Sequence, residues 1–132
     1  MPTVELVVEP WALSVCRLGP RAAWPPPPPG AAVHSVTRTP DELSVVCVEG
    51  HEPEGARVEP GWRALRIVGP LDFGLVGIVA SVTVPLAGSQ IGVFVLSTFD
   101  TDLVLVKGTE LEAAAAVLEK AGHTVTSAPP EH

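Results

Sequence analysis

Polar residues that could bind a small molecule gather in two segments of the second half of the chain. Asp72–Gly77 carries an aspartate and two glycines at the start of an apolar run with helical spacing. Ser97–Asp102 carries hydroxyl groups, an aromatic ring and two carboxylates directly after a short apolar stretch. Backbone amides at a helix start bind anions, and carboxylates bind ammonium or guanidinium groups. Together the two segments predict a site that holds both ends of a zwitterion.

The same residues also have ordinary structural interpretations. Asp72 fits an N-cap, and Gly74 with Gly77 fits close packing of a helix on a sheet. Asp100 and Asp102 fit a turn, where aspartate is common. Residue types alone therefore leave both interpretations open.

Catalysis is not expected from this sequence. Of the four histidines, none lies near a plausible nucleophile; they are His34, His51, His123 and His132. Asp100 and Asp102 could form a carboxylate pair, but on one short turn they suit ligand binding or capping better. We expect no enzyme and no cofactor.

The two cysteines and the net charge exclude further classes of function. Cys16 and Cys47 lack the spacing of metal ligands and are interpreted as small apolar strand residues, so no metal site is expected. A net charge of −7 argues against nucleic acid. Glycines, Pro85 and polar residues interrupt the apolar stretch 71–96, and no secretion signal is visible, so we expect a cytoplasmic protein without a membrane partner.

The second half has a pattern that alternates between strand and helix. Residues 62–68 alternate as a strand, and the apolar spacing after Asp72 predicts a helix that Pro85 kinks or ends. Thr109 and Glu112 form a capping box, and Gly122 fits the residue that stops this second helix. Further strands are predicted at 91–96, 103–106 and 123–126. The order β-α-β-β-α-β predicts an α+β, ferredoxin-like fold: an antiparallel sheet with both helices on one face.

The first half predicts strands at 3–9, 11–18, 33–37 and 43–48, with a bend at Pro10. Five consecutive prolines, Pro25–Pro29, must form extended polyproline II. We favour a stiff surface loop anchored by Trp24 over a ligand for a proline-recognition domain, because no basic residue accompanies the prolines in a recognition motif. The acidic connector 49–61 marks the predicted domain boundary.

Several of these motifs resemble the ACT family of regulatory domains. The resemblance rests on residues 72–81, 85–87, 97–102 and 104–107, and residues 37–47 resemble a first, shortened repeat. It is strongest to the branch of tandem ACT proteins that includes bacterial proteins of this size and the cytosolic arginine sensors. It implies two ACT-like halves, residues 1–60 (shortened) and 61–127 (a full domain), followed by a tail, 128–132.

In this family an amino acid binds where domains meet. The ligand-binding residues that the resemblance implies come from the first helix and from the turn: Asp72, Gly74, Leu75, Val76, Ser81, Val82, Thr98, Phe99, Asp100 and Asp102. Leu75 stands where arginine-specific relatives would carry an acid, so the identity of the amino acid stays open.

The resemblance implies a regulatory or sensor protein that responds to a small molecule, an amino acid, at a domain or subunit junction. A homodimer and a regulated protein partner are implied as well. The alternative is a structural ACT-like oligomerisation module without a working ligand site.

Overall fold

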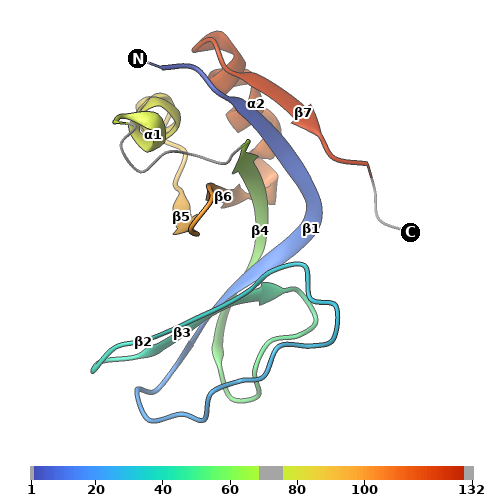
Figure 1. Cartoon of the computed structure of the whole chain (residues 1–132), viewed down its shortest axis with the longest axis vertical. Helices are drawn as coiled ribbons and strands as arrows, with labels where there is room; N and C mark the ends of the chain where they lie inside the picture. The colour runs from blue at the N-terminus through green and yellow to red at the C-terminus, as the bar shows by residue number, and fades with distance from the viewer. Residues whose placement is uncertain (1, 69–75, 130–132) are drawn as a thin grey trace. The chain divides into compact units, whose positions relative to one another are not determined.

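The computed structural model describes residues 2–68 and 76–129 (Figure 1). The chain forms two compact units: a helical unit, Met1–Pro10 with Arg63–His132, and a β unit, Trp11–Trp62. Two long strands, β1 (Glu5–Leu18) and β4 (Arg57–Ile67), run through both units. The predicted boundary at residue 60 lies close to the division at Trp62, whereas the first ten residues join the unit formed by the second half. The assignment of residues 1–60 and 61–127 to two ACT-like halves stays a prediction.

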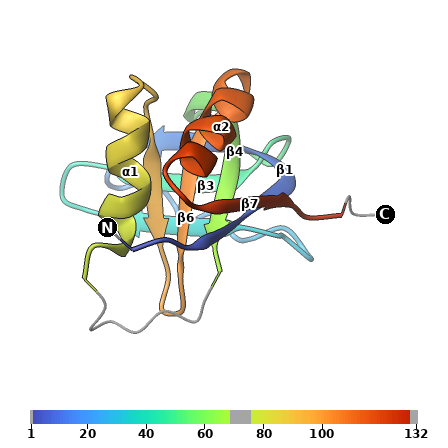
Figure 2. The ribbon, with the colours of Figure 1, turned by 90° about the horizontal axis from the view of Figure 1, so that it is seen from above.

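The helical unit contains the predicted β-α-β-β-α-β order. After β4 come α1 (Ile78–Gly88), β5 (Phe94–Ser97), β6 (Asp102–Lys107), α2 (Leu111–Lys120) and β7 (Thr124–Ser127). The two helices contact each other and share one core with the sheet. In Figure 2 both helices lie nearer the viewer than β4, β5 and β6 of this unit. The α+β, ferredoxin-like fold is confirmed.

A strand from the start of the chain completes the sheet of the helical unit. The strand order is β1-β4-β6-β5, and β7 pairs with β1 in parallel, with Glu5 opposite Thr124. β1 therefore lies between the first and the last strand of the β-α-β-β-α-β series. The sheet is antiparallel as predicted, with this one parallel pair added to it; pairing between residues so far apart has no local signal in the sequence.

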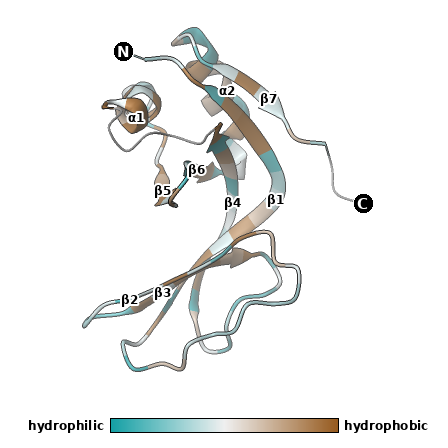
Figure 3. Cartoon of the chain, in the orientation of Figure 1, coloured by the Kyte–Doolittle hydropathy of each residue, from teal (hydrophilic) through white to brown (hydrophobic). Residues whose placement is uncertain are grey.

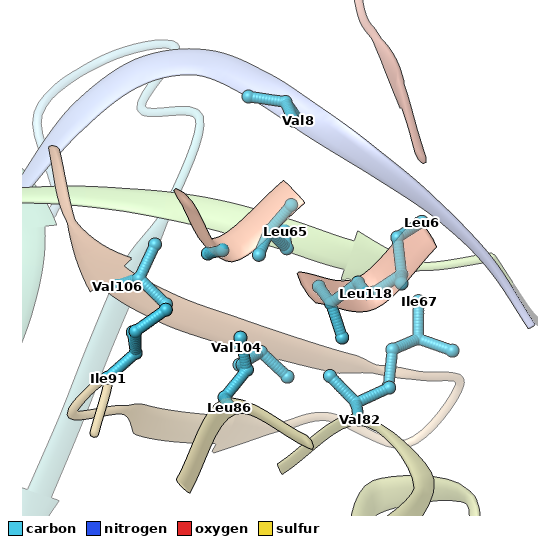
Figure 4. Packing of buried hydrophobic residues seen from close by; sticks show 11 residues of the cluster. Leu6, Val8, Leu65, Ile67, Val82, Leu86, Ile91, Val104, Val106 and Leu118 are labelled. Carbon is cyan, nitrogen blue, oxygen red and sulfur yellow. The ribbon is translucent and has the colours of Figure 1, made fainter. Parts of the chain in front are cut away.

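The core of the helical unit combines alternate strand residues with one stripe from each helix. Leu6 and Val8 come from β1, and Val82 with Leu86 comes from α1 (Figure 4). The whole cluster is Leu6, Val8, Leu65, Ile67, Val82, Leu86, Ile91, Val104, Val106, Ala114 and Leu118. The brown colour of α1 and of the first part of β1 in Figure 3 reflects this apolar content. Burial of these side chains supplies the main driving force for this unit.

Both helices begin later than the sequence predicts. Gly77 has a φ of 83° and caps α1, so the helix starts at Ile78 and not at Asp72. Thr109 lies in a 3₁₀ turn, Gly108–Glu110, and no side chain caps α2, so the predicted capping box is wrong. At the C-terminal end the prediction is confirmed, because Gly122 has a φ of 102°, which only glycine adopts readily.

The β unit is built from antiparallel strands. β2 (His34–Arg38) pairs with β3 (Leu43–Val48), and β3 pairs with the second half of β1. Pro10 does not interrupt β1, contrary to prediction. Cys16 and Cys47 are buried free thiols in a small core with Val45, which confirms their interpretation as apolar strand residues.

Candidate functional site

The predicted ligand turn joins β5 to β6 through a compact set of hydrogen bonds. Ser97 and Asp102 face each other across the two strands, and the Ser97 hydroxyl donates to Oδ1 of Asp102. The amide of Thr98 donates to the carbonyl of Thr101 at 2.8 Å, and the amide of Thr101 donates to Oγ1 of Thr98 at 3.2 Å. Side chains thus fix the shape of the turn and the position of the Asp102 carboxylate.

The turn is fastened to the end of β4. The hydroxyl of Thr101 donates to the backbone carbonyl of Ile67, the last residue of that strand. The amide of the next residue, Val68, donates to the carbonyl of Glu5 at 3.0 Å. The start of α1 lies at the same end of the sheet as this turn in Figure 2. The C-terminal end of β4, the start of α1 and the polar turn therefore lie at the same end of the sheet.

The residues predicted at the helix start are only partly described. Asp72, Gly74 and Leu75 lie outside the described residues. Val76 is described: it precedes the helix and its side chain is 89% exposed. Among the described residues, the helical amides of this segment begin at Ile78.

The two predicted residues within α1 face the core. Val82 is fully buried, and Ser81 is buried with its hydroxyl donating to the carbonyl of Ile78 at 2.6 Å. The side chains of both residues are thus used for packing and hydrogen bonding within the helical unit.

The predicted turn residues have different exposures. Thr98, Phe99 and Asp100 are exposed, with 79% of Phe99 accessible, whereas Asp102 is partly buried. The structure brings these four predicted residues together in one turn. An aromatic ring and two carboxylates on one turn suit a ligand that carries a positive group next to an apolar surface.

Two residues that hold these elements in place were not predicted. Thr101 fixes the turn to β4, and its hydroxyl could be recognised only once β4 and the turn were known to be neighbours. His123 is buried; its Nδ1 accepts from the amide of Val4 at 3.1 Å, and its Nε2 donates to the carbonyl of Ser81 at 2.8 Å. The sequence contains one indication of this role. Pro85 lies within the predicted helix and leaves the carbonyl of Ser81, four residues earlier, without a helical donor, so a donor from elsewhere in the chain is expected there.

No other chemistry stands out in the described part of the chain. There, no three histidine, cysteine or acidic side chains come together as a metal site. No helix in the same residues is long and apolar enough to cross a membrane.

The comparisons with known proteins assign a family. The model of the ACT domain matches residues 57–120, and a second model, described as an N-terminal domain, matches residues 12–54. Residues 57–120 of the chain belong to the ACT domain family. The match begins with β4 and ends with α2, so it includes the turn described above.

Curated relatives match part of this ACT domain protein. The cytosolic arginine sensor for mTORC1 subunit 1 of Rattus norvegicus is 36% identical over 70 residues, and that of Mus musculus is 37% identical over 70 residues. Each match covers 52% of the chain and 21% of the relative, so the chain spans about a fifth of the length of these relatives.

Solved structures match the whole fold. A protein from Agrobacterium tumefaciens superimposes with a TM-score of 0.90 and 39% identity, covering 100% of this chain and 98% of that one. The ligand-free regulatory subunit of aspartate kinase from Thermus thermophilus has a TM-score of 0.62 at 14% identity, covering 92% and 99%. At this low identity, the similarity to the aspartate kinase regulatory subunit shows that the two proteins share a fold and nothing more.

Proposed function

We propose that this ACT domain protein is a sensor that binds an amino acid and regulates a protein partner. The main support for the proposal is the turn between β5 and β6, which is hydrogen-bonded to the end of β4. Thr101 fixes it to Ile67, and Ser97 orients the carboxylate of Asp102. A site prearranged in this way loses little conformational entropy when a ligand binds.

The chemistry of the turn supports an amino acid as the ligand. Asp102 and Asp100 would bind an ammonium or guanidinium group, and Phe99 would cover the apolar part of the ligand. The backbone amides before and at the start of α1 would bind the carboxylate, with contributions from Asp72, Gly74, Leu75 and Val76. The similarity to the cytosolic arginine sensors makes arginine the first amino acid to test.

The mode of action follows from the same arrangement. A ligand at the junction with a second subunit would favour one association of the two copies and so change the affinity for a regulated partner. The proposal includes a homodimer, a cytoplasmic location, a bacterial source and no catalytic activity of its own. The similarity to the Agrobacterium tumefaciens protein supports the bacterial source.

Thermal unfolding in the presence of each of the twenty amino acids tests this proposal. A ligand at about a hundred times its dissociation constant should stabilise the chain by roughly 2.7 kcal/mol. Asp102→Asn should abolish that stabilisation, while Asp41→Asn, a change at an exposed aspartate of the β unit, should leave it intact. If no amino acid raises the melting temperature, the sensor proposal is wrong.

One observation favours a second candidate function, that of an oligomerisation module. Among its described residues the helical unit exposes five large apolar side chains: Val68, Val76, Val84, Val95 and Phe99. Exposed apolar side chains of this size are common where a partner covers them. Under this alternative Asp102→Asn changes nothing, and Phe99→Ser weakens self-association measured by sedimentation.

A further inference from the structure

The proline-rich segment of the β unit is held in place by side chains from β2. One guanidinium nitrogen of Arg38 donates to the carbonyl of Ala22 at 2.7 Å, and another donates to the carbonyl of Pro20. The Arg38 guanidinium also lies 5.8 Å from the centre of the Trp24 ring. Nε2 of His34 donates to the carbonyl of Pro25 at 3.2 Å. The segment is therefore attached to the body of the unit at four points.

The prolines themselves form a rigid, extended segment that ends in a turn. Each ring fixes φ and keeps the preceding residue extended, so Pro25–Pro28 must adopt polyproline II. The amide of Ala31 donates to the carbonyl of Pro28 at 3.1 Å, and Gly30 has a φ of 69°. Proline followed by a glycine of positive φ is typical of a type II turn, which ends the extended segment.

The exposure of the prolines follows the threefold period of polyproline II. Pro25 and Pro28 are partly buried, whereas Pro26, Pro27 and Pro29 are exposed. Trp24, at the head of the segment, is 56% exposed. The contact between Trp24 and Arg38 agrees with the expectation that Trp24 anchors the loop, although more than half of this side chain stays accessible. Hydrogen bonds from Arg38 and His34 hold the rest of the segment. We call the exposed side chains of Trp24, Pro26, Pro27 and Pro29 the proline ridge.

The structure also supplies the basic group that the linear motif lacks. Arg38 is far from the prolines in sequence but lies beside Trp24, and it lines an open depression of about 530 Å³ with Arg21. Aromatic-lined grooves bind polyproline II because the ligand is already ordered, and they carry acidic groups where the ligand is basic.

We propose that the proline ridge is a docking surface for a protein domain whose groove is lined by aromatic side chains and flanked by acidic ones. The ordered, exposed prolines fill the groove, and Arg21 and Arg38 face its acidic flank. This surface lies wholly within the β unit and is separate from the amino-acid site proposed for the helical unit.

Titration of the ¹⁵N-labelled full chain with three purified probes, an SH3, a WW and an EVH1 domain, tests the proposal by NMR. At least one probe should shift the indole resonance of Trp24 and the amides of residues 21–38 in a saturable manner. The double substitution Pro26→Ala with Pro27→Ala should weaken that binding by about tenfold or more. Pro129→Ala, at an exposed proline outside the ridge, should bind as the unsubstituted chain does.

Circular dichroism first verifies that each variant is folded. The proposal is overturned if none of the three probes shifts these resonances, or if the double variant binds as tightly as the unsubstituted chain.

Discussion

Nε2 of His123 donates a hydrogen bond of 2.8 Å to the backbone carbonyl of Ser81, the carbonyl that Pro85 leaves without a helical donor. A proline within a helix normally costs stability, because it removes one hydrogen bond and crowds the preceding turn. Here α1 continues past Pro85 to Gly88, since a buried imidazole replaces the missing N–H. On its other side the ring accepts from the amide of Val4. An amide only donates and a carbonyl only accepts, so the proton of the ring is on Nε2.

The first prediction concerns this replacement. His123→Ala should lower the free energy of unfolding by about 3 kcal/mol, because a buried carbonyl at Ser81 and a partly buried amide at Val4 lose their partner. Pro85→Ala restores a helical donor for the Ser81 carbonyl. In that background the cost of His123→Ala should fall by roughly 1 kcal/mol. Urea denaturation of the four proteins measures this coupling.

The exposed His51 offers the control, and His51→Ala should change stability by less than about 0.5 kcal/mol. Strictly additive effects of the substitutions at 85 and 123 would show that the imidazole does not replace the helical donor.

The second prediction concerns stability at alkaline pH. Burial, together with the neighbouring Cys16, raises the pKa of Cys47 from 9.0 to about 12. The unfolded chain thus loses this proton first as pH rises, and the folded chain binds more protons between these values. The free energy of unfolding should therefore fall from pH 9 upward. Urea denaturation at pH 8, 9 and 10 in reducing buffer should show a smaller decline for Cys47→Ala than for the unsubstituted chain.

Iodoacetamide provides a second readout, since only the thiolate reacts. Both thiols should react slowly in the folded chain at pH 8 and rapidly in urea. Equal rates in the two states would contradict the assigned burial.

Helices and strands were predicted well where the residues that determine them lie in one short segment of the sequence. The apolar run Leu43–Val48 is a strand with the predicted bounds, and Gly122 ends its helix as its conformation requires. The capping box at Thr109 failed because a favourable motif also fits a 3₁₀ turn. Helix α1 starts late because the positive φ of Gly77 interrupts a pattern that looks continuous in the sequence.

Long-range contacts could not be predicted in this way. β1 pairs with β7 across more than a hundred residues, and no turn connects them. At the candidate site the chemistry of the turn was visible in the sequence, whereas its attachment to Ile67 depends on which strands are neighbours. The contact between Arg38 and Trp24 could not be predicted either, because it also depends on which segments are neighbours in the fold.

A third prediction concerns the attachment of the turn. Thr101→Val keeps the shape of the side chain but removes the hydroxyl that donates to Ile67. We expect a loss of about 1 kcal/mol in the free energy of unfolding, because the carbonyl loses its partner near the surface. Hydrogen exchange of the amides of residues 98–102 should accelerate. Thr126→Val, at an exposed position of β7, is the control and should leave that exchange unchanged. Unchanged exchange in Thr101→Val would show that the hydroxyl does not hold the turn.

The last prediction compares two glycines that differ in conformation. Gly122 has a φ of 102°, and a Cβ added there would lie 3.1 Å from Cγ2 of Thr3. Gly88, the last residue of α1, has open space around it and no positive φ. Gly122→Ala should therefore cost about 1–2 kcal/mol through backbone strain and crowding, whereas Gly88→Ala should be neutral or stabilise by up to about 1 kcal/mol. Thermal and urea unfolding measure both effects. Equal effects of the two substitutions would contradict the left-handed conformation of Gly122 and, with it, the tight connection from α2 to His123 and β7.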